Sequence, residues 1–252
     1  MRKAIFSATA AIFLVLSGPS LAVESIEIPK RDWSFQGIFG TYDRASMQRG
    51  LQIYKESCSG CHSLNLIYFR NLTDLGYTEA QVKAFAAEYE VQDGPNDEGE
   101  MYNRPAQPQD RFVKPFPNDN AARAGNNGAL PPDLSLMVEA RIGGPNYVYA
   151  LLTGYADVPA GTELMEGMNY NKYFPGHQIA MASPLSEDGI DYEDGTKATV
   201  AQQAEDIVTF LAWASEPNME ERKKMGIKVL IFLIVLTGIL IAVKKRVWAD
   251  VH

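Results

Sequence analysis

The chain has 252 residues, with 23 basic and 31 acidic side chains and a formal charge of −8. This length allows one large domain or two small ones, and the negative charge argues against a nucleic-acid partner. At 46% hydrophobic, 10% aromatic and 21% charged residues, the composition is that of a folded protein, neither disordered, collagenous nor a polytopic membrane bundle. The only cysteines are Cys58 and Cys61, which excludes a disulfide-stapled scaffold and a four-cysteine zinc site.

The N-terminus has the pattern of a signal peptide. Arg2 and Lys3 precede a mostly apolar run from Ala4 to Leu16, and Ser20-Leu21-Ala22 offers small residues for cleavage. The run is shorter than the ~20 residues that span a bilayer, and it lacks the Arg-rich character of an organellar transit peptide. We therefore predict that residues 1–22 are a signal peptide of a bacterial exported protein. A retained N-terminal anchor is the alternative.

A helix is predicted just before the first cysteine. Apolar residues recur there at helical spacing: Met47, Leu51 and Tyr54. Gly50 interrupts this stripe, and a glycine on such a face permits close approach by another helix. Phe210 or Trp213 on a later helix is a candidate for that contact, although ordinary core packing explains the same pattern.

The segment Cys58-Ser59-Gly60-Cys61-His62 has the form C-x-x-C-H, the attachment motif of a c-type haem. Two residues between the thiols let both sulfurs reach one edge of a porphyrin, and the adjacent histidine presents a neutral nitrogen to the iron. A thiol-disulfide oxidoreductase also uses C-x-x-C outside the cytoplasm. That alternative fits less well, because no Val/Ile-rich strand leads into Cys58.

The exported segment is more acidic than the whole chain. Between Val23 and Asn218 there are 28 acidic and 14 basic side chains, a formal charge of −14. A basic partner and simple solubility explain this charge equally well. Six acids fall in one stretch without a base, around the turn signal Asp93-Gly94-Pro95-Asn96: Glu88, Glu90, Asp93, Asp97, Glu98 and Glu100. Most such runs are solvated loops, but this run at residues 88–100 is our candidate for docking a basic partner, to be tested by charge reversal of Glu98 and Glu100.

The remainder of this segment predicts a mainly helical, loop-rich body. Residues 104–118 contain four prolines and cannot form a continuous helix, so we expect an extended loop. Little strand pattern appears anywhere. A second helix is predicted ahead of Pro217 by apolar residues at helical spacing: Val200, Ala204, Ile207, Leu211 and Ala214.

A haem held by His62 requires a sixth iron ligand from elsewhere in the chain. The candidates are histidines and methionines: His177, His252, Met47, Met101, Met137, Met165, Met168, Met181, Met219 and Met225. Met181 lies in an irregular loop ahead of the second helix, where a side chain can be aimed at a cofactor. Most methionines are core filler, so the residues alone leave Met181 and His177 both open.

The C-terminal region predicts a single membrane-spanning helix. Asn218 and Glu221 fit a capping box, and Ile227 to Val243 is apolar except for a lysine and a threonine. These 17 residues give roughly 25 Å of helix, and flanking lysines and an arginine can snorkel to the headgroups. A buried helix of a soluble domain would show more polar positions.

The positive-inside rule is undecided here, because basic residues flank both ends of the apolar stretch. The signal peptide supplies the orientation: the middle of the chain is exported and the tail through His252 stays in the cytoplasm. We predict a signal peptide at 1–22, a periplasmic domain at 23–217 and an anchor with a short tail at 218–252.

At this point the residues resemble a known family, cytochrome c1, the haem subunit of the cytochrome bc1 complex. The likeness is carried by motifs along most of the chain: Arg49-Gly50, Tyr54-Lys55, residues 90–96, residues 126–135, Leu152 to Tyr155, Tyr173 to Gly176, Asp194 to Thr196 and Arg222 to Gly226. Two departures are visible, Ser183 and Lys197, each where a proline is common. Neither removes a ligand.

The resemblance implies roles for particular residues. Met181 takes the position of the axial methionine, opposite His62, and Arg141 falls where an arginine lies beside a haem propionate. A guanidinium suits that role because it pairs bidentately with a carboxylate. Haem-pocket lining is implied for five more residues: Asn126, Pro131, Pro132, Phe174 and Ile179.

We therefore expect a mainly α-helical c-type cytochrome domain with long loop insertions and one C-terminal transmembrane helix, in the bacterial inner membrane. One covalent haem c, attached through Cys58 and Cys61, would transfer single electrons without an acid-base or nucleophilic active site. The resemblance implies the Rieske iron-sulfur protein as donor, cytochrome b as membrane neighbour and a cytochrome c as acceptor. A free-standing anchored cytochrome feeding a terminal oxidase is the alternative, although His62 and Met181 are 119 positions apart, a large separation for a simple carrier.

Overall fold

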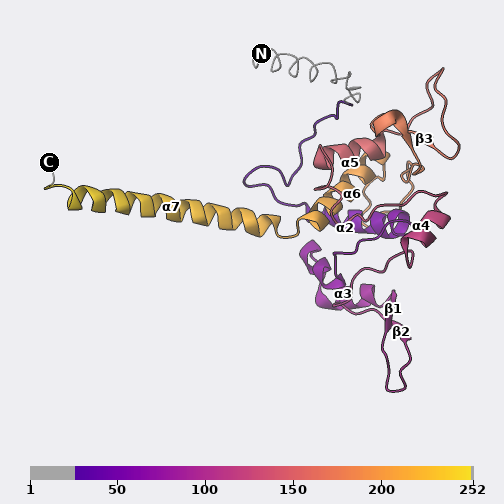
Figure 1. The fold of residues 1–252 in the computed structure, drawn as a ribbon, viewed down its shortest axis with the longest axis horizontal. Coiled ribbons are helices and arrows are strands. Elements are labelled where there is room, and N and C mark those ends of the chain that lie inside the picture. Colours follow the sequence, from indigo (N-terminus) through magenta and orange to yellow (C-terminus); the bar gives the residue numbers. More distant parts are fainter. Residues whose placement is uncertain (1–25, 251–252) are drawn as a thin grey trace, which may run out of the picture.

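The computed structural model describes residues 26–250, so the predicted signal peptide at 1–22 lies outside the described residues. Short helices and loops form a head, residues 26–218, from which one long helix extends (Figure 1). The helices are α2 (Arg44–Ile53), α3 (Glu79–Ala86), α4 (Asp119–Gly125), α5 (Gly144–Thr153), α6 (Val200–Ser215) and α7 (Met219–Val247). The 3₁₀ turns η2 (Phe69–Leu75) and η3 (Pro175–His177) join them, and a π-turn, η1 (Tyr54–Cys58), continues α2.

The core of the head is built on the crossing of α2 and α6 at Gly50. A Cβ placed on Gly50 would lie 2.3 Å from the carbonyl oxygen of Asp206 and 2.5 Å from the Cβ of Phe210. Only a glycine allows the two helices to come this close. The predicted contact with Phe210 is therefore confirmed. The hydrophobic core that includes this crossing contains several fully buried large side chains: Met47, Ile53, Tyr54, Phe69, Phe210 and Trp213.

A buried ion pair fixes the same two helices. The guanidinium of Arg49 donates from Nε and Nη2 to the two carboxylate oxygens of Asp206, at 2.8 and 2.9 Å, and Asp206 is fully buried. The hydroxyl of Ser46 adds a third bond to Asp206, at 2.7 Å. The hydrogen bonds that Arg49 itself makes to Asp206 raise the pKa of Arg49 above its ordinary value. A buried carboxylate that accepts three hydrogen bonds from these two residues is satisfied, so the pair fixes the helix register.

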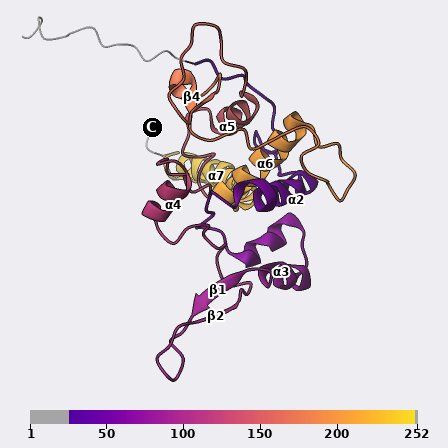
Figure 2. The same ribbon diagram turned by 90° about the vertical axis from the view of Figure 1, so that its right-hand side faces the viewer.

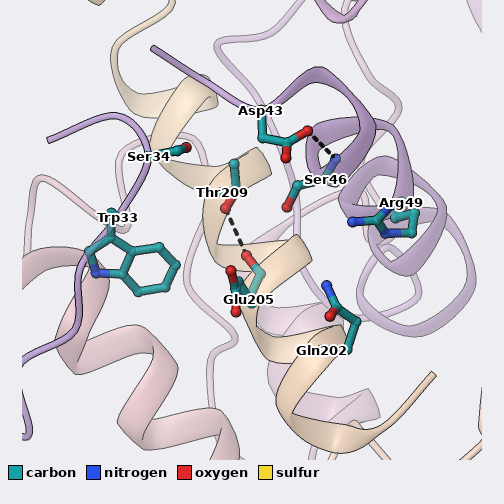
Figure 3. Close-up of a pocket in the computed structure, with 8 residues that line it drawn as sticks. All are labelled: Trp33, Ser34, Asp43, Ser46, Arg49, Gln202, Glu205 and Thr209. Carbon is teal, nitrogen blue, oxygen red and sulfur yellow. Dashed lines mark hydrogen bonds between the residues drawn. The ribbon is translucent and has the colours of Figure 1, made fainter. Parts of the chain in front are cut away.

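A small polar hollow opens beside this crossing (Figure 3). Its walls come from the segment ahead of α2, from α2 and from α6: Trp33, Ser34, Asp43, Ser46, Arg49, Gln202, Glu205 and Thr209. Asp43 caps α2, accepting from the backbone N–H of Ser46 at 3.2 Å, and the Thr209 hydroxyl donates to the Glu205 carbonyl at 2.8 Å. Its lining polar groups serve the helices, and none belongs to the C-x-x-C-H segment.

The acidic run does not form a plain loop. Strands β1 (Glu90–Asp93) and β2 (Tyr102–Pro105) pair antiparallel, with Glu90 opposite Pro105 and Asp93 opposite Tyr102. The hairpin projects from the head (Figures 1 and 2). A second short pair joins β3 (Asn169–Tyr170) to β4 (Gln178–Ile179). The expectation of an extended loop from residue 104 is corrected at its first residues, because Arg104 and Pro105 belong to β2.

Helix α7 is the predicted anchor. It is long and apolar enough to cross a membrane, alone among the helices within residues 26–250, and no part of its most apolar stretch is buried in the protein. The helix starts at Met219 as expected, but the predicted capping box is wrong, because the Asn218 side chain makes no capping hydrogen bond. The mainly helical fold with one C-terminal membrane helix is confirmed.

Replacing Gly50 with alanine should destabilise the head. The added methyl would overlap backbone and side-chain atoms of α6, and overpacking of this kind costs about 1–3 kcal/mol, against about 1 kcal/mol gained in helix propensity. We expect the free energy of unfolding to fall by about 1 kcal/mol in denaturant melts followed by far-UV circular dichroism.

Gly226→Ala is the matched control, since no heavy atom lies within 4 Å of a Cβ at Gly226 in α7. It should leave stability unchanged or raise it slightly. Equal melts for Gly50→Ala and the wild type would show that the helix crossing does not depend on this glycine.

Candidate functional site

The C-x-x-C-H segment is wound into one tight turn at the end of α2. The N–H of Ser59 donates to the Tyr54 carbonyl at 2.8 Å, and the N–H groups of Cys61 and His62 both donate to the Cys58 carbonyl, at 3.1 and 2.9 Å. Cys58 is half-buried and packs against the core, whereas Cys61 is exposed. The turn therefore presents two thiols and an imidazole from five consecutive residues.

The imidazole of His62 is held in a defined orientation. Its Nδ1 lies 2.7 Å from the carbonyl oxygen of Pro132, which can only accept a hydrogen bond, so Nδ1 carries the proton. Burial lowers the pKa of His62, and this outweighs the opposing effects of the Pro132 bond and the Asp133 charge. A neutral ring protonated at Nδ1 leaves the lone pair on Nε2 available, and no group within residues 26–250 bonds to Nε2. This donor arrangement fits a haem iron.

The segment that carries Pro132 is fastened to the segment that carries His62. The carboxylate of Asp133 accepts from the Ser63 hydroxyl and the Asn65 N–H, both at 2.8 Å, and from the Ser135 N–H at 2.9 Å. Burial by itself would raise the pKa of Asp133, but these hydrogen bonds outweigh it and lower the pKa. Asp133 is thus a positioning residue that sequence reasoning missed. Its only signal was its place in the stretch from 126 to 135.

Met181 lies in a loop braced by Tyr155, which follows the end of α5. The phenol of Tyr155 donates to the Met181 carbonyl at 3.0 Å, and the Met181 side chain packs half-buried against the same core as Cys58. Ile179, two residues earlier, is buried and pairs with Asn169 across the second strand pair. The loop is held by packing and strand pairing.

His177, the other ligand candidate, is engaged elsewhere. Its Nδ1 lies 3.3 Å from the Asn171 carbonyl oxygen, and its ring stacks on Tyr170 with centroids 5.8 Å apart. Asn171 is fully buried and donates from its amide to Leu151, which fixes this corner. Since His177 serves the corner itself, Met181 is the freer of the two side chains. His252 lies outside the described residues.

The remaining predicted pocket residues make no hydrogen bonds or ion pairs with one another within the described part of the chain. Arg141 is exposed, donates to the Ala140 carbonyl at 3.3 Å, and has no carboxylate at ion-pair distance within the described residues. Asn126 is half-buried and donates to Ala122 at the end of α4. Pro131 and Phe174 are half-buried and Pro132 is exposed. Arg141 is therefore available to an external anion, whereas Asn126 also serves its own helix.

The thiol-disulfide alternative lacks its chemical requirement. Both cysteines are free in this structure. Burial, with a smaller effect of Cys61, raises the pKa of the Cys58 thiol to about 12. A thiol-disulfide oxidoreductase needs a thiolate with a lowered pKa, so this environment disfavours disulfide exchange at Cys58.

These features are typical of membrane-anchored c-type cytochromes: a helical head with a C-x-x-C-H turn, a neutral imidazole oriented by a backbone carbonyl, and one helix long and apolar enough to cross a membrane. A profile of the Cytochrome C1 family matches residues 33–251, and the chain belongs to that family. Cytochrome c1 of Rhodospirillum rubrum is 48% identical, covering 96% of this chain and 95% of its own. An Arabidopsis thaliana relative named as a mitochondrial heme protein, cytochrome c1 1, is 52% identical, covering 93% of this chain and 76% of its own.

The chain is also 50% identical to cytochrome b/c1 of Bradyrhizobium diazoefficiens over 89% of its length, although the match covers only 36% of that longer protein. Family membership implies haem-based electron transfer in a cytochrome bc1 complex. The recognition made from the motifs is confirmed.

Asp133→Ala should loosen the histidine segment. It removes two hydrogen bonds that join Ser63 and Asn65 to the Asp133 carboxylate and a local one from the Ser135 N–H, so we expect the free energy of unfolding to fall by about 2 kcal/mol. Asp97→Ala, an exposed acid on the hairpin, is the control and should change stability by less than about 0.5 kcal/mol.

The pH dependence gives a second measurement of the same contribution. Because the folded state lowers the pKa of Asp133 below its ordinary 3.8, its contribution is present above that pH and is lost as acid protonates the folded carboxylate. The wild type should therefore lose more stability than Asp133→Ala between neutral pH and pH about 3. Parallel stability curves for the two proteins would contradict the assignment.

Proposed function

We propose that this protein transfers single electrons through one covalently attached haem c, as the cytochrome c1 subunit of a quinol–cytochrome c oxidoreductase. The Rieske iron-sulfur protein is the donor, cytochrome b the membrane neighbour and a cytochrome c the acceptor. The observation that carries the proposal is His62, a neutral imidazole within a C-x-x-C-H turn whose Nδ1 is bonded to Pro132 and whose Nε2 is unengaged.

Ten residues of this chain would hold the haem. Cys58 and Cys61 form thioethers, His62 and Met181 ligate the iron, and Arg141 pairs with a propionate. The others line the pocket: Asn126, Pro131, Pro132, Phe174 and Ile179. The buried Ile179 and the half-buried Phe174 and Pro131 supply apolar surface, which suits a porphyrin face.

The bound haem would supply one-electron chemistry. Ligation by His and Met raises its reduction potential, so that it can accept an electron from a donor whose own reduction potential is fairly high. The protein's part is to keep both ligands in place. The Pro132 carbonyl holds the proton of His62 at Nδ1, so no proton has to move at this ring. The Tyr155 phenol holds the Met181 backbone. Neither ligand, His62 or Met181, acts as an acid, a base or a nucleophile.

The anchor places this site beside a membrane. We propose that residues 23–217 form a periplasmic domain of a bacterial inner-membrane protein, that 218–252 form the anchor and a cytoplasmic tail, and that 1–22 are removed as a signal peptide. The apolar, unburied surface of α7 supports the anchor.

The tip of the β1–β2 hairpin is our candidate for docking a basic cytochrome c. Glu98 and Glu100 are exposed there, and no cation within residues 26–250 lies at ion-pair distance from either. Their N–H groups both donate to the Asn96 side chain, at 3.0 and 2.9 Å, which orders the tip. Asp93 at the base is paired with Arg104 instead. An ordered tip with unpaired acids suits electrostatic steering.

Met181→Leu should lower the reduction potential. Loss of the thioether removes the ligand that favours the reduced iron, so we expect a fall on the order of 0.2 V, a fraction of the roughly 0.8 V that axial ligands span. The measurement is a redox-titrated visible spectrum of the purified membrane protein, with co-purifying subunits identified.

Met165→Leu is the matched control, because Met165 is 61% exposed in a neighbouring loop, and it should titrate like the wild type. A normal potential in Met181→Leu would move the sixth ligand to His177. Absence of haem would return the cysteines to thiol chemistry, and a haem protein that never co-purifies with cytochrome b would favour a free-standing carrier.

Reversing charge at the hairpin tip should slow reaction with the acceptor. We expect Glu98→Lys/Glu100→Lys to lower the bimolecular rate of reduction of a basic cytochrome c at low ionic strength and to flatten its salt dependence. Glu163→Lys/Glu166→Lys makes the same change in total charge on another exposed loop. Equal slowing in both pairs would show that net charge, and not the hairpin, steers the acceptor.

A further inference from the structure

We propose that the loop at residues 36–40, just ahead of α2, is a second membrane contact that inserts Ile38 and Phe39 into the lipid headgroup layer beside α7. The inference rests on the proposed anchor. It adds a lipid-binding surface on the head to the spanning helix.

The loop exposes two large apolar side chains that the core does not take. Ile38 is 68% and Phe39 83% exposed, although Phe35 and Tyr42 on either side of them are buried. Adjacent exposed apolar residues at a loop tip are costly in water and are typical of an interaction site.

The backbone holds these side chains at the tip of a closed turn. The N–H of Thr41 donates to the Ser34 carbonyl at 3.0 Å, which closes the base. Gly37 has a φ of +72°, and a Cβ on Gly40 would lie 1.9 Å from the Gln36 carbonyl oxygen, so both glycines are required by the turn. The exposure of the tip is therefore fixed by the fold.

The turn is fastened to the first part of the anchor. The ammonium of Lys223 in α7 donates to the carbonyls of Phe35 and Gly40, at 2.6 and 3.0 Å, which are the two ends of the loop. Just after the loop, the N–H of Tyr42 donates to Glu220 at 2.9 Å. The segment ahead of α2 accordingly reaches out beside the start of α7 (Figure 1).

The distance from this junction to the hydrocarbon matches the headgroup layer. Lys223 precedes Ile227, where the apolar stretch begins, by four residues, or about 6 Å of helix. The headgroup layer of one leaflet is about 5–7 Å thick. Lys228 is exposed on the same stretch of α7 and suits the phosphates of anionic lipids, whereas Lys224 is paired with Glu221 at 2.9 Å. Aromatic and aliphatic side chains at this depth partition into the bilayer interface.

Site-directed spin labelling tests the contact in the full-length holoprotein, reconstituted in vesicles of phosphatidylcholine and phosphatidylglycerol. A nitroxide is attached at Phe39→Cys, and its collisions with oxygen, which concentrates in lipid, are compared with those of a water-soluble nickel chelate. Ile38→Cys is a second labelling site. Met101→Cys, 53% exposed on the hairpin, is the aqueous control, and Leu233→Cys in α7 is the membrane control. The unmutated holoprotein should take up no label, because its cysteines are bonded to haem.

We expect the oxygen-to-nickel ratio at positions 38 and 39 to rise above that at 101 and to stay below that at 233. Ratios at 38 and 39 equal to that at 101, with 233 in lipid, would overturn the loop contact and leave the anchor standing. An aqueous ratio at 233 would overturn the anchor and the loop contact together, while the visible spectrum of the same sample would still show whether the haem is attached and can be reduced. Shielding of 39 from both reagents in the whole oxidoreductase complex would show that a partner protein covers the loop, which would also overturn the proposal.

Discussion

The close approach of α2 and α6 at Gly50 is the constraint on which the site depends. Since η1 and the C-x-x-C-H turn continue directly from α2, any change in how α2 lies on α6 moves both thiols and His62 together. The Arg49–Asp206 ion pair lies at the same interface. The remaining guanidinium nitrogen of Arg49, Nη1, donates to the Asp194 carboxylate at 2.8 Å, in the loop that leads into α6. Two motifs far apart in the sequence, Arg49-Gly50 and Asp194 to Thr196, thus form one structural unit. Its role is to fix the position of the C-x-x-C-H turn.

The elements that a periodic pattern can reveal were predictable, and those built from isolated polar contacts were not. Apolar spacing located α2, α6 and α7, and the glycine in the α2 stripe indicated Phe210 correctly. The β1–β2 hairpin was not predicted, because its strands are only four residues long and mostly polar. Such strands show no alternation of apolar and polar residues that would distinguish them from a solvated loop. The capping box at Asn218 failed because Asn218 has φ −90° and ψ 10°, outside the extended conformation in which an N-cap side chain reaches the N–H groups of the first turn.

The same division runs through the candidate site. The spacing of Cys58, Cys61 and His62 is a local signal that a single motif carries, so it could be read directly. The proposal of Met181 as the sixth ligand needed the resemblance, since nothing in an irregular loop separates a ligand from core filler. The carbonyl of Pro132 and the carboxylate of Asp133 act on residues about 70 positions earlier through single hydrogen bonds. No sequence pattern specifies such long-range pairs.

The junction between head and anchor determines how the site faces the membrane. A flexible linker after α6 would let the head tumble above the bilayer, but Met219 is buried and Arg44 pairs with both oxygens of Glu220, at 3.1 and 3.0 Å. Lys223 then fastens the loop at 36–40 to the next turn of α7. Since the first turns of α7 are part of the folded head, the direction of the helix is transmitted to α2, and from α2 to the C-x-x-C-H turn. The hairpin leaves the head in a different direction from α7 (Figures 1 and 2). A rigid junction therefore keeps the acidic tip clear of the anchor while the apolar loop stays beside it, so that one arrangement suits both the proposed soluble acceptor and the proposed membrane contact.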